Sequence, residues 1–164
     1  MFERRARGRK DGKNQSLGQV VVEMALVLPV FFAIVFTIME IGNLAFWMIV
    51  LNHAAYEAAR AGALLAGPDP GTNSGGVNIS RAKQKAQEIL QRIITTATCE
   101  VASESTFPDR QAGGVMNQDL IVKAHFDVHL AFPISSIMLS NPKGSGKYGL
   151  DVAVRMPIEQ PLRQ

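Results

Sequence analysis

The stretch GQVVVEM, residues 18–24, places a carboxylate, Glu23, at the very start of a long apolar run. From residue 25 to residue 51 the chain is apolar almost without interruption, and its only strongly polar residues are Glu40 and Asn43. A charge near the centre of a bilayer costs about 2.5–3.5 kcal/mol, so an acid in such a run indicates a function. This stretch therefore decides how the rest of the chain is organised.

The apolar run is long enough for a membrane-spanning helix. A helix needs roughly 20 residues to cross a bilayer, and the segment of about residues 24–51 provides more than that. A secretory signal peptide is the rival interpretation, but its apolar core has only about 7–15 residues and precedes the cleavage site. We therefore expect a long N-terminal helix over residues 19–66, bent locally at Pro29, whose first part is the transmembrane segment.

Charge predicts the orientation of this helix. Residues 1–18 form a leader that carries six Arg and Lys against two acidic residues, while the whole chain has a net charge of only +3. No Lys or Arg follows between Gln19 and Tyr56. The positive-inside rule then places the N-terminus in the cytoplasm and the C-terminal part outside. Because no aromatic side chains interleave the basic ones to stack bases, we expect no nucleic-acid partner.

Small residues dominate the helix after the apolar run. Ala54, Ala58, Ala61 and Gly62 lie near one face at helical spacing. Such a stripe allows another helix, or the sheet of the chain's own domain, to approach closely. The helix should end before residues 67–79, which form a loop rich in Gly and Pro.

The remaining residues, 80–164, predict a small α+β domain. Ser80 is expected to be the N-cap of an amphipathic helix, with polar residues such as Gln87 on its outer side. The apolar residues of this helix recur at intervals of three and four: Ala82, Ala86, Ile89, Leu90, Ile93, Ile94 and Ala97.

The pattern then changes to alternation, which is typical of strands with one face on a core. Residues 122–130 and 150–156 alternate in this way, a third strand is expected around residues 100–105, and residues 133–139 suggest a short helical turn. The predicted fold class is thus a long N-terminal pilin-like helix followed by a small domain with a short antiparallel sheet.

The sequence offers little for catalysis. His125, Asp127 and His129 share one face of a strand and could in principle hold zinc, but exposed polar strand residues are the simpler interpretation. No nucleophile with a paired base and no phosphate-binding loop is recognisable. A single cysteine, Cys99, excludes an intrachain disulfide, so it is either a small, half-buried residue or an intermolecular bridge. We expect no enzymatic activity, no cofactor and no resident metal.

The two acids of the apolar run have different interpretations. Glu23 could simply sit at the level of the cytoplasmic headgroups. If the chain is cut after Gly18, however, the new amino group of Gln19 could pair with Glu23 of a neighbouring subunit and set the register of a helix bundle. Glu40 either approaches the outer interface or makes a second contact between subunits.

A glycine followed five residues later by a glutamate at the start of a membrane-length helix resembles the processing site of type IV prepilins. Together, residues 18–29, 40–42 and 52–63 resemble the TadE-like pseudopilins of the tight-adherence (Tad) pilus system. The similarity is strong over about residues 17–65. One departure is Met24, because an aromatic residue commonly follows the glutamate in this system.

This resemblance implies a minor pilin or assembly component in the bacterial inner membrane. Gly18 and Gln19 would flank the bond cut by a prepilin peptidase, and Glu23 would serve recognition and assembly. Other Tad pilins or pseudopilins, the assembly platform and membrane lipid would be the partners. The alternative is an uncleaved, membrane-anchored domain that binds a ligand outside the cytoplasm.

Overall fold

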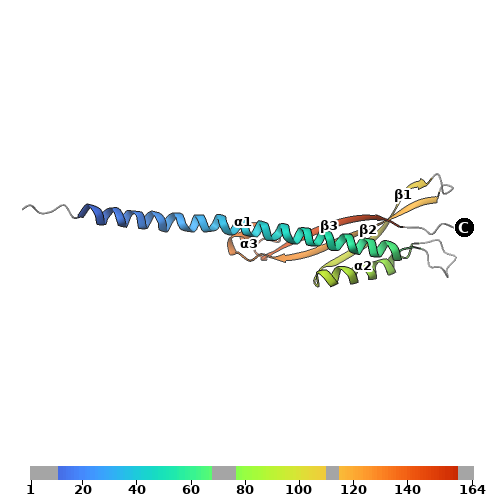
Figure 1. The fold of residues 1–164 in the computed structure, drawn as a ribbon. Helices are drawn as coiled ribbons and strands as arrows, with labels where there is room; N and C mark the ends of the chain where they lie inside the picture. Colours follow the sequence, from blue (N-terminus) through green and yellow to red (C-terminus); the bar gives the residue numbers. More distant parts are fainter. Residues whose placement is uncertain (1–10, 68–76, 110–114, 159–164) are drawn as a thin grey trace, which may run out of the picture.

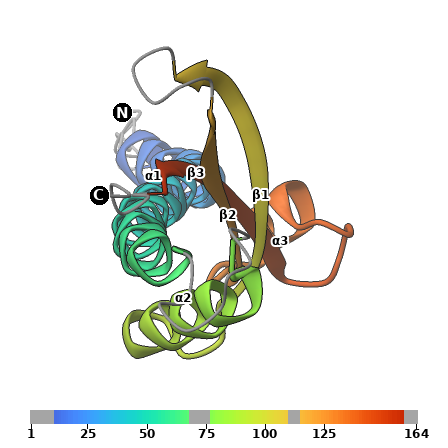
Figure 2. The same ribbon diagram turned by 90° about the vertical axis from the view of Figure 1, so that its right-hand side faces the viewer.

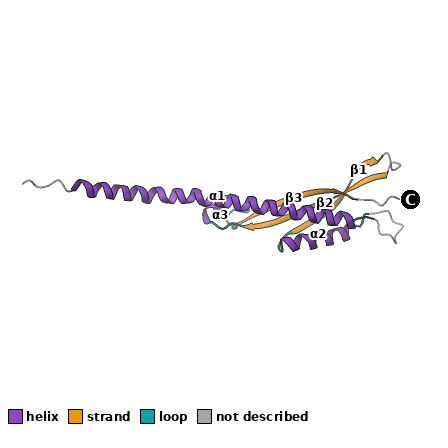
Figure 3. Ribbon diagram, viewed as in Figure 1, coloured by secondary structure: helices purple, strands orange, loops and turns teal. Residues whose placement is uncertain are grey.

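The computed structural model describes residues 11–67, 77–109 and 115–158. The elements in chain order are α1 (Asp11–Leu65), α2 (Ile79–Ile93), β1 (Thr98–Asp109), β2 (Val115–His129), α3 (Pro133–Leu139) and β3 (Lys147–Pro157). Most of the predicted basic leader, residues 1–10, and of the predicted loop, residues 68–76, lie outside the described residues. Helices and a three-stranded antiparallel sheet are both present, which confirms the predicted α+β class (Figure 3).

The two halves of α1 have different surroundings. The C-terminal half lies along a small domain, and the N-terminal half projects far beyond it (Figure 1). α1 continues as a single helix through Pro29. Within the described residues, Gly18–Leu65 is the one helical segment long and apolar enough to cross a membrane. Its large apolar side chains between Val20 and Met39 are mostly exposed, so the chain itself does not cover this part.

The sheet has the order β1-β2-β3, with both neighbouring pairs antiparallel. Val122 lies in the central strand and pairs with Val101 on one side and Val154 on the other. The predicted alternation is confirmed along β2, where Val122, Ala124, Phe126 and Val128 are buried and Lys123, His125, Asp127 and His129 are exposed. The sheet thus has one apolar face and one polar face.

α1 and α2 together cover the apolar face of the sheet, as the view along the molecule shows (Figure 2). The core contains many alanines, among them Ala54, Ala58, Ala82 and Ala86, which are all fully buried. Larger side chains fill the space further along, where the ring of Trp47 lies 5.2 Å from that of Phe126. The molecule is therefore a two-layer structure with its polar sheet face open.

Two details of α2 differ from the sequence-based predictions. The helix begins at Ile79 with Asn78, not Ser80, as N-cap, because the Asn78 side chain accepts a hydrogen bond from the Arg81 amide. It also ends at Ile93, before Ala97. Gln87, expected on the polar side, is half-buried: it donates to the Ala97 carbonyl at 3.0 Å and accepts from the Cys99 amide at 2.9 Å. This side chain therefore fastens α2 to the start of β1.

The predicted small-residue stripe of α1 packs against the chain's own domain. Ala54 and Ala58 are fully buried, Gly62 is buried and Ala61 is half-buried. A Cβ atom at Gly62 would lie 3.0 Å from Leu120 Cδ2 in β2 and 3.3 Å from the Ala82 carbonyl oxygen in α2. Glycine at residue 62 therefore lets α1, α2 and β2 approach one another without displacing Leu120 or the Ala82 carbonyl.

Gly62→Ala should destabilise the domain by about 1–3 kcal/mol, because the added methyl overpacks this junction. Gly42→Ala is the matched control: it also lies in α1, but its Cβ would meet nothing within 4 Å. Thermal unfolding of the full chain in detergent checks this. Equal midpoints for the two variants would contradict the packing account.

Candidate functional site

The predicted processing site lies on the projecting half of α1. Gly18, Gln19 and Glu23 are all exposed, and a Cβ atom at Gly18 would meet nothing within 4 Å. Glu23 makes no hydrogen bond or ion pair with any described residue. The exposed carboxylate can be reached from outside the chain, and its role in assembly stays a prediction.

Glu40 has a different environment, because it is fully buried. Its carboxylate lies beside the segment that leads from β2 into α3. The amide of Ala131 lies 3.2 Å from each carboxylate oxygen, and the amide of Phe132 donates to Oε2 at 3.2 Å. The Ser135 hydroxyl is 3.2 Å from Oε2 and 2.8 Å from the Phe132 carbonyl oxygen, to either of which it can donate.

This arrangement holds the chain in place where it enters α3. Phe132 is the N-cap of α3, and its side chain makes no capping hydrogen bond. Backbone N–H groups at such a turn need acceptors when they are shielded from water. Glu40 supplies them from 91 residues earlier in the chain. A carboxylate buried without such donors would cost several kcal/mol, so α3 and α1 stabilise each other here.

Neither interpretation of Glu40 from the sequence included this role. The sequence suggested the outer interface or a contact between subunits, whereas the structure gives the carboxylate a partner within its own chain. The sequence did signal that the residue matters, since it is an acid inside an apolar run. The sequence did not indicate the partner, because the donors are backbone N–H groups, which almost every residue carries.

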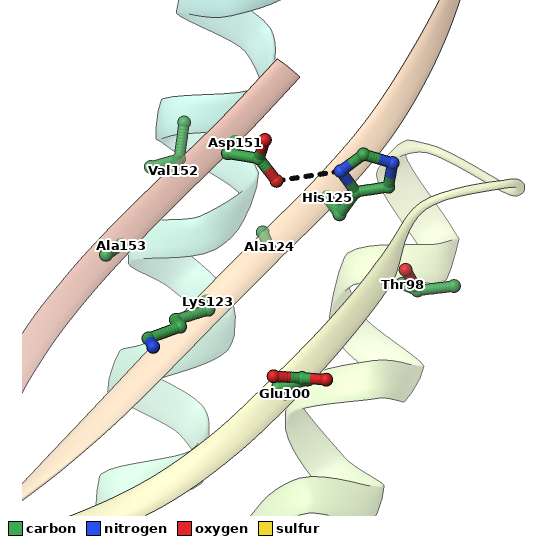
Figure 4. A pocket seen from close by; sticks show the side chains of 8 residues that line it. All are labelled: Thr98, Glu100, Lys123, Ala124, His125, Asp151, Val152 and Ala153. Atoms are coloured by element: carbon green, nitrogen blue, oxygen red, sulfur yellow. Dashed lines mark hydrogen bonds and ion pairs between the residues drawn. The ribbon is translucent and has the colours of Figure 1, made fainter. Parts of the chain in front are cut away.

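The polar face of the sheet carries a shallow hollow of about 590 Å³ (Figure 4). Glu100, Lys123, His125 and Asp151 line it from all three strands. His125 Nδ1 lies 2.7 Å from Asp151 Oδ1, and its Nε2 lies 3.3 Å from Asp127 Oδ1. His125 is thus occupied by two carboxylates, and the described residues contain no group of side chains suited to hold a metal ion.

The hydrogen bond to Asp151 raises the pKa of His125, and the negative charge of Asp127 adds to this. The protonated imidazole is therefore favoured in the folded state. Its small contribution to stability is present at acidic pH and is lost as the pH rises through the raised pKa. His125 and Asp127 are about half exposed and Asp151 is 80% exposed, so solvent screens the interaction.

Cys99 is buried at the start of β1, as one of the two sequence-based interpretations proposed. Burial raises the pKa of its thiol. A protonated, buried thiol is a poor nucleophile, so Cys99 acts here as a small apolar residue of the core.

Glu40→Ala should release the segment before α3, because the amides of Ala131 and Phe132 lose their acceptor. The local cost of about 1–3 kcal/mol predicts exchange of these amides with deuterium roughly tenfold faster or more. Thr37→Ala is the control, since its hydroxyl donates to the Ala33 carbonyl within α1 and leaves α3 untouched. Unchanged protection of residues 131–140 in Glu40→Ala would contradict this role of Glu40.

Comparison with known proteins finds a match that lies entirely within α1. Residues 18–60 match the family described as TadE-like protein. No curated protein and no solved structure matches the chain. The matched segment includes both acids of the apolar run and the beginning of the small-residue stripe. The resemblance inferred from the sequence is thereby confirmed over residues 18–60, where the chain is similar to the TadE-like proteins of Tad pilus systems.

Proposed function

We propose that this chain is a minor pilin or pseudopilin that assembles through α1 after a prepilin peptidase cuts it behind Gly18. Before the cut, α1 holds the protein in the bacterial inner membrane with the basic leader in the cytoplasm and the sheet domain outside. One observation carries the proposal: the part of α1 from Val20 to Met39 is apolar, largely exposed and projects beyond the domain. Such a helix needs either lipid or neighbouring helices around it.

The same half of α1 supports the site of cleavage. Gly18 is exposed, and glycine weakens a helix by roughly 0.5–1 kcal/mol relative to alanine. Local unwinding at this residue would therefore let a peptidase reach the bond to Gln19. The basic residues before it keep the bond on the cytoplasmic side of the membrane.

Glu23 supports the mode of assembly. In a bundle of apolar helices an unpaired carboxylate is costly, and so is an unpaired amino group. Cleavage creates an amino group at Gln19, which can neutralise Glu23 of a neighbouring subunit at one axial stagger only. Glu40 is already bonded within its own chain, so Glu23 is the acid of the apolar run that is left for this role.

The alternative function is an uncleaved, membrane-anchored binding domain. The observation that favours it is the hollow on the polar face of the sheet, which faces away from both α1 and α2. The two functions differ in the fate of the leader. Both require the membrane helix.

N-terminal sequencing of protein from the native host separates the two. A pilin-like subunit loses its first 18 residues and begins at Gln19, and Gly18→Ala blocks this loss. Recovery of intact chains alone, with Gly18→Ala behaving like the wild type, would establish the uncleaved anchor instead.

Glu23→Ala should insert into the membrane normally but fail to enter pili. Leaving the neighbour's amino group unpaired costs about 2.5 kcal/mol or more, which corresponds to a drop well above tenfold in the incorporated fraction. Glu57→Ala removes an acid from the domain-bound half of α1 and serves as the control. Immunoblots of membranes measure insertion, and immunoblots of sheared pili measure incorporation. Normal incorporation of Glu23→Ala would rule out the register role.

A further inference from the structure

The segment around α3 is unusual for the surface of a folded domain. No charged residue occurs between His129 and Lys143. Within it, Ile137 and Met138 are adjacent and 70% and 73% exposed. Single exposed apolar residues are ordinary, but an uncharged segment with two neighbouring large ones indicates a contact surface.

The position of α3 along α1 is well defined. The Phe132 ring stacks on Phe36 at a centroid distance of 4.8 Å and an angle of 10°. One turn further along α1, Glu40 holds the amides of Ala131 and Phe132. α3 therefore lies at the end of the domain from which the projecting N-terminal half of α1, called the free half below, emerges (Figure 1).

That end lies within the depth of a bilayer that α1 spans. With Glu23 at the headgroup level, a hydrocarbon core of about 30 Å covers roughly 20 residues and ends near Asn43. At 1.5 Å per residue, Phe36 is then about 10 Å inside this boundary and Glu40 about 5 Å. Interfacial helices bury their apolar faces to a depth of about 5–10 Å, which is the depth of α3.

Charge around α3 fits a surface of anionic lipid. Residues 128–149 contain two lysines, Lys143 and Lys147, and no Asp or Glu. Both lysines are exposed in the segment that follows α3. Lysines at this level can extend to lipid phosphates while the apolar residues next to them enter the acyl region.

We propose that α3 is a second membrane contact, which inserts Ile137 and Met138 into the lipid leaflet on the domain's side of the bilayer. This inference rests on the proposed membrane anchoring by α1. A single helix leaves the domain free to tilt and to rotate about the helix axis. A second contact at α3 fixes one orientation of the sheet relative to the membrane before assembly.

Depth-dependent fluorescence quenching tests this in the full chain. The protein, with Cys99→Ala, is placed in vesicles of phosphatidylethanolamine and phosphatidylglycerol. A fluorophore is attached at one of three exposed residues: Met138→Cys, Ile34→Cys in the free half of α1, or Leu64→Cys at the far end of the domain. Quenching groups sit on the lipid chains, either near the headgroup or near the chain end.

The fluorophore at residue 138 should lose severalfold more fluorescence than the one at residue 64. Its strongest quenching should come from the quencher near the headgroup. Ile34 should be quenched most by the quencher near the chain end. Quenching of Ile34 without quenching of Met138 would overturn the inference and leave the anchoring intact. An unquenched Ile34 would overturn the anchoring and the inference together. A blue-shifted but unquenched Met138 would show that a second copy covers α3, which also overturns the proposal.

Discussion

The buried carboxylate of Glu40 is the interaction on which the layout of this protein depends. Its hydrogen bonds to Ala131 and Phe132 join the start of α3 to the middle of α1. A carboxylate in this position is tolerated only because those donors are present. Glu40 thus marks the point on α1 where the chain's own domain begins. From Gly18 to Phe32 the helix is exposed, Phe36 makes the first aromatic contact with the domain, and after Glu40 one face is progressively buried.

The domain-bound half of α1 depends on close approach. Ala54, Ala58 and Gly62 allow the helix to lie against both α2 and the sheet, and a methyl group at Gly62 would force Leu120 and the Ala82 carbonyl to shift. The same chain therefore combines two kinds of helix surface. One is bulky and apolar, suited to lipid or to other helices; the other is small and suited to its own sheet.

Local patterns in the sequence were sufficient for most of the fold. The alternation at residues 122–130 predicts which side chains of β2 are buried. Successive side chains of a strand point to opposite faces of the sheet, so the apolar ones all lie on the face that packs on the core. The N-cap was placed two residues late, at Ser80, because Asn78 and Ser80 are both good capping residues and only the backbone selects between them.

Long-range polar contacts could not be predicted. Gln87 bridges to Ala97 and Cys99, and Glu40 reaches Ala131, in each case through backbone groups that every residue carries. Of the candidate site, Gly18, Gln19 and Glu23 were identified because their spacing resembles a prepilin processing site, and their roles stay predictions. The sequence did separate Glu23 from Glu40, but it could not show that the folded domain buries Glu40, because that depends on contacts with residues 91 and 92 positions later.

We expect α1 to leave the lipid near Asn43 and to continue as the helix of the domain. Single cysteines placed along residues 30–65 and tested in cells with a membrane-impermeant maleimide address it directly. The account predicts no labelling at any residue before Asn43. Beyond it, labelling should follow the helical period, with Tyr56 and Leu64 reactive and Ala54 and Ala58 protected. Periodic labelling that extends back through Ile34 would show that the free half of α1 lies in water, and would contradict the account.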